Sequence, residues 1–146
     1  MKRDYRFITG IEQLEAIFGE KLSFHDAEVT RLALSRGREE YGEALLDIDI
    51  HIFAVEGLSP DDRSFVLGRH HLASLQFVSI QELELSNFNH QNAIMGLHIQ
   101  KLNPPINGAQ YRVSIPAAFG LDAHFNCFEV LLRGIQPCFP SGRLDA

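Results

Sequence analysis

The segment from Glu43 to Phe53 constrains the fold more than any other part of the chain. Its aliphatic and polar residues alternate, in the order Leu46-Asp47-Ile48-Asp49-Ile50-His51-Ile52. Successive side chains of a β-strand point to opposite faces, so this pattern predicts a strand with one face on a core and the other in water. Residues 28–35 show the same period. The polar loop 36–42 between the two segments therefore predicts an antiparallel hairpin.

A single segment has helical spacing. Its apolar residues recur three and four positions apart on one helix face: Ile11, Leu14, Ile17 and Phe18. This spacing predicts a helix over about residues 10–18. Thr9 and Glu12 fit a capping box, in which the Thr9 hydroxyl caps the first turn and Glu12 bonds back. Gly19 follows as a C-terminal stop.

The rest of the chain repeats short apolar runs separated by turn residues. Further strands are predicted at 63–68, 72–79, 81–88, 93–101, 110–115 and 123–133, with turns at 57–62 and 103–108. Seven or eight strands roughly ten residues apart predict a mainly β fold, either an antiparallel sandwich or a strongly curved barrel-like sheet, with one short N-terminal helix. We expect a single domain over residues 1–146, with a loosely held tail from about residue 136.

The acidic charge of the chain is confined to its first half. The 146 residues carry a net charge of −6, of which residues 1–62 contribute −7 and residues 63–146 contribute +1. A chain of this length buries a core without disulfides or metal. An acidic surface repels nucleic acid and membrane headgroups and attracts basic partners. Direct binding to nucleic acid or to a membrane is therefore not expected.

The cysteines and the N-terminus indicate a cytoplasmic protein. Cys127 and Cys138 are too few for a disulfide framework. The basic segment Met1–Arg6 is not followed by an apolar run of signal-peptide length. No stretch approaches the roughly 18 apolar residues of a membrane span. We expect both thiols to be reduced.

The pair His25-Asp26 opens the first predicted strand, inside the hexapeptide Phe24-His25-Asp26-Ala27-Glu28-Val29. An Asp beside a His can orient the imidazole for general acid–base work. Neighbouring residues on a strand point to opposite faces, so these side chains meet only if the chain turns there. Strand geometry favours the alternative, a structural polar pair at the strand entrance.

Asp47, Asp49 and His51 are expected to lie on one strand face, within reach of a cation. Carboxylates and imidazoles are common metal ligands, but metal sites usually draw on more than one element. Outward polar residues are also what any amphipathic strand carries. We favour a solvated face, with no metal ion and no cofactor. The seven histidines and two cysteines also lack the spacing of a zinc motif.

Nucleophilic chemistry has little support in the sequence. No serine elbow or glycine-rich phosphate loop occurs. Cys127 lies in an apolar run and is expected to pack in a strand rather than to react. The amide-rich segment Asn87-Phe88-Asn89-His90-Gln91-Asn92 separates two predicted strands. Its side chains are expected to bond their own backbone in a tight turn, with bonds to a partner's backbone as the alternative.

Two segments resemble the immunity protein 50 family of bacterial polymorphic toxin systems. The hexapeptide from Phe24 to Val29 is similar to the aromatic-or-apolar, His-Asp opening of that family, so His25 and Asp26 are its motif positions. Residues 75–85, leading into 87–94, resemble its apolar strand and Asn-containing turn. The likeness spans roughly residues 20–100. It implies a mainly β body and a role in neutralising a toxin made by the same cell.

The first functional hypothesis is a non-enzymatic binding protein that occludes a cognate toxin. Charge complementarity would raise the association rate, and a few buried anchors would hold the complex. We expect the acidic surface to lie on the strand face of Asp47, Asp49 and His51, with the acidic residues of the preceding segment beside it: Glu39, Glu40 and Glu43.

Two alternatives remain open. One is a small metal-dependent hydrolase that uses His25 and Asp26, with Asp47 or Asp49 as a further ligand or base. The other is a structural, self-associating β-protein, because exposed strand edges favour pairing and would give a homodimer.

Overall fold

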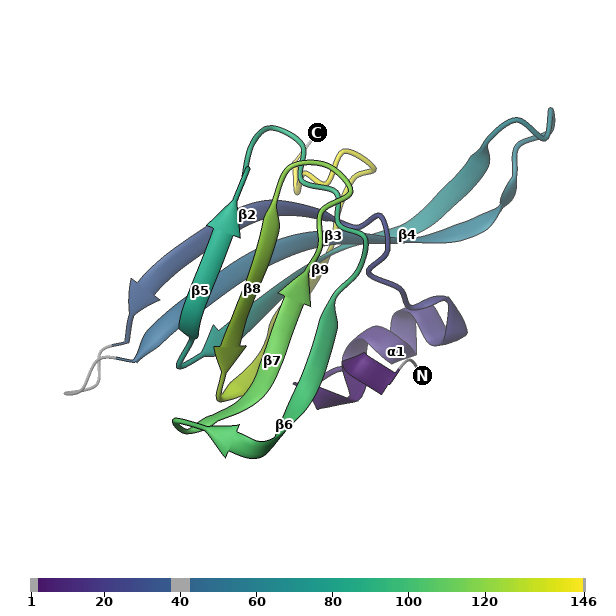
Figure 1. The fold of residues 1–146 in the computed structure, drawn as a ribbon. Helices are drawn as coiled ribbons and strands as arrows, with labels where there is room; N and C mark the ends of the chain where they lie inside the picture. Colours follow the sequence, from purple (N-terminus) through teal and green to yellow (C-terminus); the bar gives the residue numbers. More distant parts are fainter. Residues whose placement is uncertain (1–2, 38–42, 146) are drawn as a thin grey trace.

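A computed structural model describes residues 3–37 and 43–145. Two β-sheets pack face to face, and a short helical region lies beside them (Figure 1). Neither sheet closes into a barrel, so the prediction of a mainly β fold is confirmed in its sandwich form.

The larger sheet has five strands in the order β1-β9-β4-β3-β2. The parallel pairing of β1 with β9 sits at one edge, and the other neighbours in this sheet are antiparallel. In chain order its strands are β1 (Ile8–Thr9), β2 (Glu28–Arg36), β3 (Ala44–Leu58), β4 (Phe65–Val78) and β9 (Glu129–Pro137).

The smaller sheet has four strands in the order β5-β8-β7-β6, all antiparallel. They are β5 (Gln81–Ser86), β6 (His98–Ile106), β7 (Ala109–Ile115) and β8 (Asp122–Cys127). Each sheet therefore presents one face to the other sheet and one outward face.

The core between the sheets follows the alternation seen in the sequence. Leu46, Ile48, Ile50 and Ile52 of β3 are fully buried. Phe77 of the larger sheet meets Phe125 of the smaller one edge to face, with ring centroids 4.9 Å apart. Burial of each large apolar side chain contributes about 1.5–3 kcal/mol, so this layer is the main stabilising element of the fold.

Strands β3 and β4 are longer than predicted. The predicted strands 63–68 and 72–79 form one strand, because the pairing register shifts near Arg69 (φ 54°) and the strand continues through the bulge. Strand β3 likewise runs past the start of the turn predicted at 57–62 and ends at Leu58.

The strand predicted at 123–133 is two strands in different sheets. The chain leaves β8 at Cys127 and enters β9 at Glu129. At the crossing residue, Phe128 N donates to Val78 O at 2.8 Å. The sequence does not reveal this change of sheet, because apolar residues continue from one partly buried strand into the next.

The strand predicted at 93–101 begins only at His98 and extends to Ile106. Residues Ala93 and Ile94 make isolated bridges instead, to Glu28 and Ala117. The turn predicted at 103–108 is correspondingly shorter: a two-residue Asn107-Gly108 turn, in which both residues have positive φ.

The N-terminal helix α1 spans Glu12–Phe18 and ends at Gly19 as predicted. The predicted capping box is wrong. Ile11 is the N-cap residue without a side-chain cap bond, because Thr9 is extended in β1 opposite Leu131. Short 3-10 turns flank the helix: η1 (Arg3–Phe7) and η2 (Gly19–Lys21). Within residues 3–37 and 43–145, no helix is long and apolar enough to cross a membrane.

The ends of β3 and β4 project beyond the body of the sandwich (Figure 1). Pairing of β2 with β3 reaches only His51, and pairing of β9 with β4 reaches only His71. Beyond these points the two strands pair only with each other, through Val55–Leu67 and Leu58–Phe65. We call residues 54–68 the β3–β4 arm.

The buried side chain of Asn92 joins three segments of the chain. Its Oδ1 accepts hydrogen bonds from Asn89 N at 2.9 Å and Leu121 N at 3.1 Å. Its Nδ2 donates to Asn89 O at 2.7 Å and to Val29 O at 3.3 Å. The prediction that the amide-rich segment bonds its own backbone is confirmed. Asn92 also fastens that turn to the start of β2 and to the segment before β8.

Gly120 allows this close packing. It has a φ of +75°, and a Cβ atom there would lie 2.2 Å from Gln91 O and 2.6 Å from Asn92 Oδ1. The first contact is with backbone, which cannot move aside without breaking the turn.

Substitution G120A is expected to lower the free energy of unfolding by about 3 kcal/mol, because it adds backbone strain and displaces Asn92. G108A is the matched control. Gly108 also has positive φ, but its added Cβ would meet nothing within 4 Å. Only strain remains there, which costs about 1 kcal/mol. Urea denaturation of both variants measures the difference, and equal losses would contradict the proposed clash.

Candidate functional site

The side chains of His25 and Asp26 meet at an exposed turn. Asp26 has a φ of 65°, so the chain turns at this point and His25 Nδ1 lies 3.1 Å from Asp26 Oδ2. The two side chains are 56% and 61% exposed. The turn brings the two side chains together, which strand geometry did not predict, and leaves both exposed to water.

The residues around this pair anchor the turn to the body. Phe24 is fully buried, and its backbone N donates to the Tyr5 hydroxyl at 2.9 Å. Asp26 N donates to Ile94 O at 2.9 Å, and Ile94 N donates to Ala27 O at 3.0 Å. The two segments that resemble the family therefore bind each other. The motif connects the start of β2 to the residues after the amide-rich turn through these backbone hydrogen bonds.

Asp47 and Asp49 lie on the outward face of the larger sheet, as the alternation predicts. Gln76 Nε2 donates to Asp47 Oδ1 at 3.0 Å, and Ser74 Oγ donates to Asp49 Oδ1 at 2.7 Å. Arg31 Nη1 lies 4.0 Å from Asp49 Oδ2. These contacts fix both carboxylates on the sheet, while each side chain remains partly exposed and able to accept further hydrogen bonds.

His51 shares the strand face of these carboxylates but is buried. It is 5% exposed, and its Nε2 lies 2.8 Å from His70 Nδ1. Burial lowers the pKa of His51, and the neighbouring His70 lowers it further. The neutral ring can share one proton with His70 across this bond, whereas two protonated rings would repel each other.

The C-terminal segment covers His51. Cys138 N donates to His70 O at 3.1 Å, and Gly142 N donates to Phe139 O at 2.8 Å. Gly142 lies against the imidazole so closely that a Cβ atom there would be 3.1 Å from His51 Nδ1. The segment predicted to be a loosely held tail thus folds back over the outward face of the larger sheet.

The remaining candidate residues are dispersed. Glu43 is exposed just before β3, whereas Glu39 and Glu40 lie outside the described residues. The backbone N of Asp26 donates to Ile94 O, whereas the side chains of Asp47 and Asp49 accept hydrogen bonds from β4. In the part of the chain that the structure describes, no group of three or more His, Cys, Asp or Glu side chains is placed to hold a metal ion.

Cys127 is a core residue, as predicted. It is fully buried, and burial raises the pKa of its thiol to about 12, with the nearby Glu129 adding to the increase. A thiol with so high a pKa carries almost no thiolate at neutral pH, so it is unsuited to nucleophilic chemistry.

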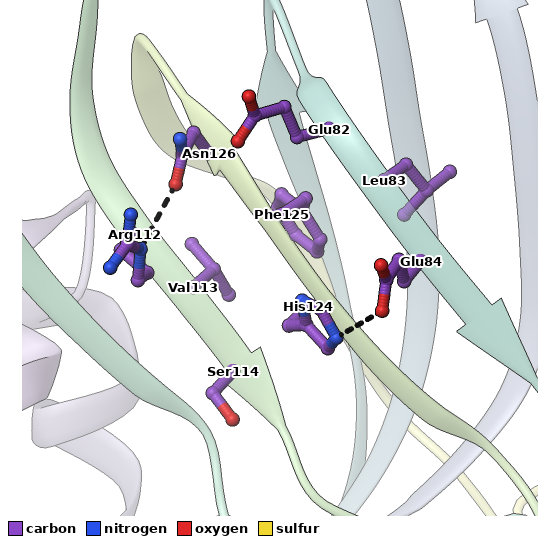
Figure 2. A pocket seen from close by; sticks show the side chains of 9 residues that line it. All are labelled: Glu82, Leu83, Glu84, Arg112, Val113, Ser114, His124, Phe125 and Asn126. Carbon is purple, nitrogen blue, oxygen red and sulfur yellow. Dashed lines mark hydrogen bonds and ion pairs between the residues drawn. The ribbon is translucent and has the colours of Figure 1, made fainter. Parts of the chain in front are cut away.

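The outward face of the smaller sheet holds a groove of about 710 Å³ that the sequence analysis did not find (Figure 2). Its polar side chains come from β5, β7 and β8. His124 Nε2 lies 2.8 Å from Glu84 Oε2, and Arg112 Nε donates to Asn126 Oδ1 at 3.3 Å. The alternation Glu82-Leu83-Glu84 was the available signal, but the partner strand of β5 could not be read from it.

Ser114, His124 and Glu84 form one row across three neighbouring strands. Nucleophilic catalysis requires the serine hydroxyl to bond the histidine ring. Among the described residues, Ser114 makes no such bond to His124, and the dashed line that starts at His124 in Figure 2 leads to Glu84. Over half of His124 and of Glu84 is exposed to water. The groove therefore presents exposed polar and charged side chains to the solvent.

The buried histidine pair predicts a dependence of stability on pH. Because His51 has a lowered pKa in the folded state, the unfolded chain binds its proton more readily as pH falls below about 6.5. The free energy of unfolding is expected to decrease between pH 7.5 and pH 5.5. Urea denaturation of H51Q should show a smaller decrease, whereas H90Q, in an exposed turn, should keep the wild-type decrease. An unchanged pH dependence in H51Q would contradict this assignment.

Comparison with known proteins identifies a family. The family model of immunity protein 50 matches residues 10–138. No curated protein matches the chain, and no solved structure does. The matched region includes the motif turn, the amide-rich segment and every strand of both sheets except β1. On this evidence the chain belongs to the immunity protein 50 family.

Proposed function

We propose that the chain neutralises a cognate bacterial toxin by binding it, without catalysis. Membership of an immunity protein family supports a toxin as the partner in general. The observation that carries the proposal is the outward face of β3, where Asp47 and Asp49 are held at fixed positions and remain partly exposed. A rigid acidic surface of this kind suits recognition of a basic protein surface.

The mechanism is occlusion with electrostatic guidance. Opposite charges on two proteins raise the association rate, and fixed side chains lose little conformational freedom when they bind. The hydrogen bonds from Ser74 and Gln76 hold the two carboxylates before the partner arrives. Glu43 extends the acidic surface at the start of β3, and Glu39 and Glu40 precede it in the sequence.

Coexpression tests the proposal directly. Cells that express the polymorphic toxin encoded beside the gene of this chain are expected to grow only when the chain is present. The two purified proteins are expected to form a stoichiometric complex on a sizing column. Continued growth arrest, together with separate elution of the two proteins, would refute toxin neutralisation by binding.

The acidic face predicts a kinetic effect. The double variant D47N/D49N keeps acceptor oxygens for Ser74 and Gln76 but removes two negative charges. Its association rate with the inactivated toxin is expected to fall about three- to tenfold at low salt, and the difference should disappear near 0.5 M salt because of screening. Stopped-flow or biosensor kinetics measure this rate.

The control for this experiment removes two charges elsewhere. Glu12 and Glu20 are exposed in the N-terminal helical region, so E12Q/E20Q changes the net charge equally but leaves the outward face of β3 intact. Equal slowing by both double variants would show that net charge, rather than this face, guides association.

A further inference from the structure

The β3–β4 arm exposes large apolar side chains that the fold does not use. Val55, Leu58, Phe65 and Leu67 are 47%, 54%, 66% and 42% exposed. Phe65 and Leu67 are two residues apart on β4, and their cross-strand partners are Leu58 and Val55. Alternation along a strand therefore places all four on one face of the arm. We call these four residues the arm patch.

The opposite face of the arm is fastened to the helical region. Glu56 lies over Gly68, where a Cβ atom would be 2.8 Å from its Cγ, and its carboxylate meets Lys21 Nζ at 3.0 Å and Arg69 Nε at 2.9 Å. Arg69 Nη1 in turn donates to Ile17 O at 3.2 Å. The arm is thus held at one orientation, and the arm patch is left on the side turned away from these bonds.

The tip of the arm is acidic and closed by its own hydrogen bonds. Ser59 Oγ donates to Asp61, Arg63 N donates to Asp61 Oδ1 at 3.1 Å, and Ser59 N donates to Ser64 O at 2.8 Å. Asp62 and Arg63 follow directly, so the tip carries two carboxylates and one guanidinium, a net charge of −1. The tip combines an apolar surface with a small negative charge.

We propose that the arm patch is the apolar anchor of toxin binding and inserts into an apolar cleft rimmed by Lys and Arg on the toxin. The inference rests on the proposed function and adds the element that holds the complex. A few side chains buried in pockets supply most of the binding energy at protein interfaces, large aromatic residues prominent among them, and charged residues at the rim guide approach. Phe65 is the aromatic side chain of the patch.

Charge decides between a toxin and a second copy of this chain as the occupant of the patch. A homodimer formed through the arms would bring together two tips that each carry a net charge of −1 from Asp61, Asp62 and Arg63, on chains that each carry a net charge of −6. Like charges placed opposite each other across an interface oppose association. In a basic cleft on the toxin, the same carboxylates would instead make favourable contacts with Lys and Arg.

The arm patch also extends the acidic face. Strand β3 carries Asp47 and Asp49 on its outward side, and Val55 follows on that side beyond Phe53. The acidic and apolar surfaces therefore lie along one strand, separated by His51 beneath the C-terminal segment. A partner that spans both would meet the carboxylates at one end and the arm patch at the other.

The test compares two exposed phenylalanines by the same substitution. F65S and the double variant L58S/F65S are expected to weaken binding to the catalytically inactivated neighbouring toxin at least ~30-fold, measured by calorimetry, and to reduce growth protection. F119S is the matched control, because Phe119 is 63% exposed outside the arm, close to the 66% of Phe65. Circular dichroism and thermal unfolding establish that all variants are folded.

The outcomes separate the anchor from the function. Loss of binding in the arm variants with full binding by F119S supports the arm patch. Wild-type affinity in L58S/F65S refutes the arm patch and leaves toxin neutralisation intact. A wild-type homodimer in light scattering that F65S dissociates assigns the patch to a second copy and overturns the proposal. Absence of toxin binding by the wild type removes the proposed function and this inference together.

Discussion

The four hydrogen bonds of the Asn92 side chain fix the relative positions of three segments whose apolar residues enter the core. Asn92 connects the turn after β5, the start of β2 and the segment before β8. Each of its polar atoms is buried and paired, so loss of the side chain would leave backbone donors and acceptors without partners. Since the His25-Asp26 turn is bonded to the residues directly after Asn92, the position of the family motif depends on this amide.

The two outward sheet faces differ in what they offer to a partner. The face of the larger sheet combines carboxylates fixed by Ser74 and Gln76 with a projecting apolar arm, and a folded C-terminal segment lies between them. The face of the smaller sheet pairs Glu84 with His124 and joins Arg112 to the neutral Asn126, and in the described part of the chain it has no apolar arm beside these polar groups. Protein interfaces combine an apolar centre with a polar rim, and this combination favours the outward face of the larger sheet as the binding surface.

Patterns within a strand could be predicted from the sequence, whereas contacts between distant strands could not. The alternation from Leu46 to Ile52 gave the buried face correctly because it depends only on strand period. The burial of His51 was missed because Gly142 and His70 cover it from elsewhere in the chain. Thr9 was wrongly placed in a cap because its pairing with Leu131 is equally remote. The groove at His124 was missed for the same reason.

The residues that hold the arm in place are different from the residues that it exposes to a partner. The salt bridges of Glu56 and the small Gly68 fix where the arm lies, while the arm patch contributes little to the core. Substitutions in the patch would therefore change what the arm contacts at little cost in folding stability. Such a division makes the arm a surface that can be redesigned for a new partner while the sandwich is left as it is.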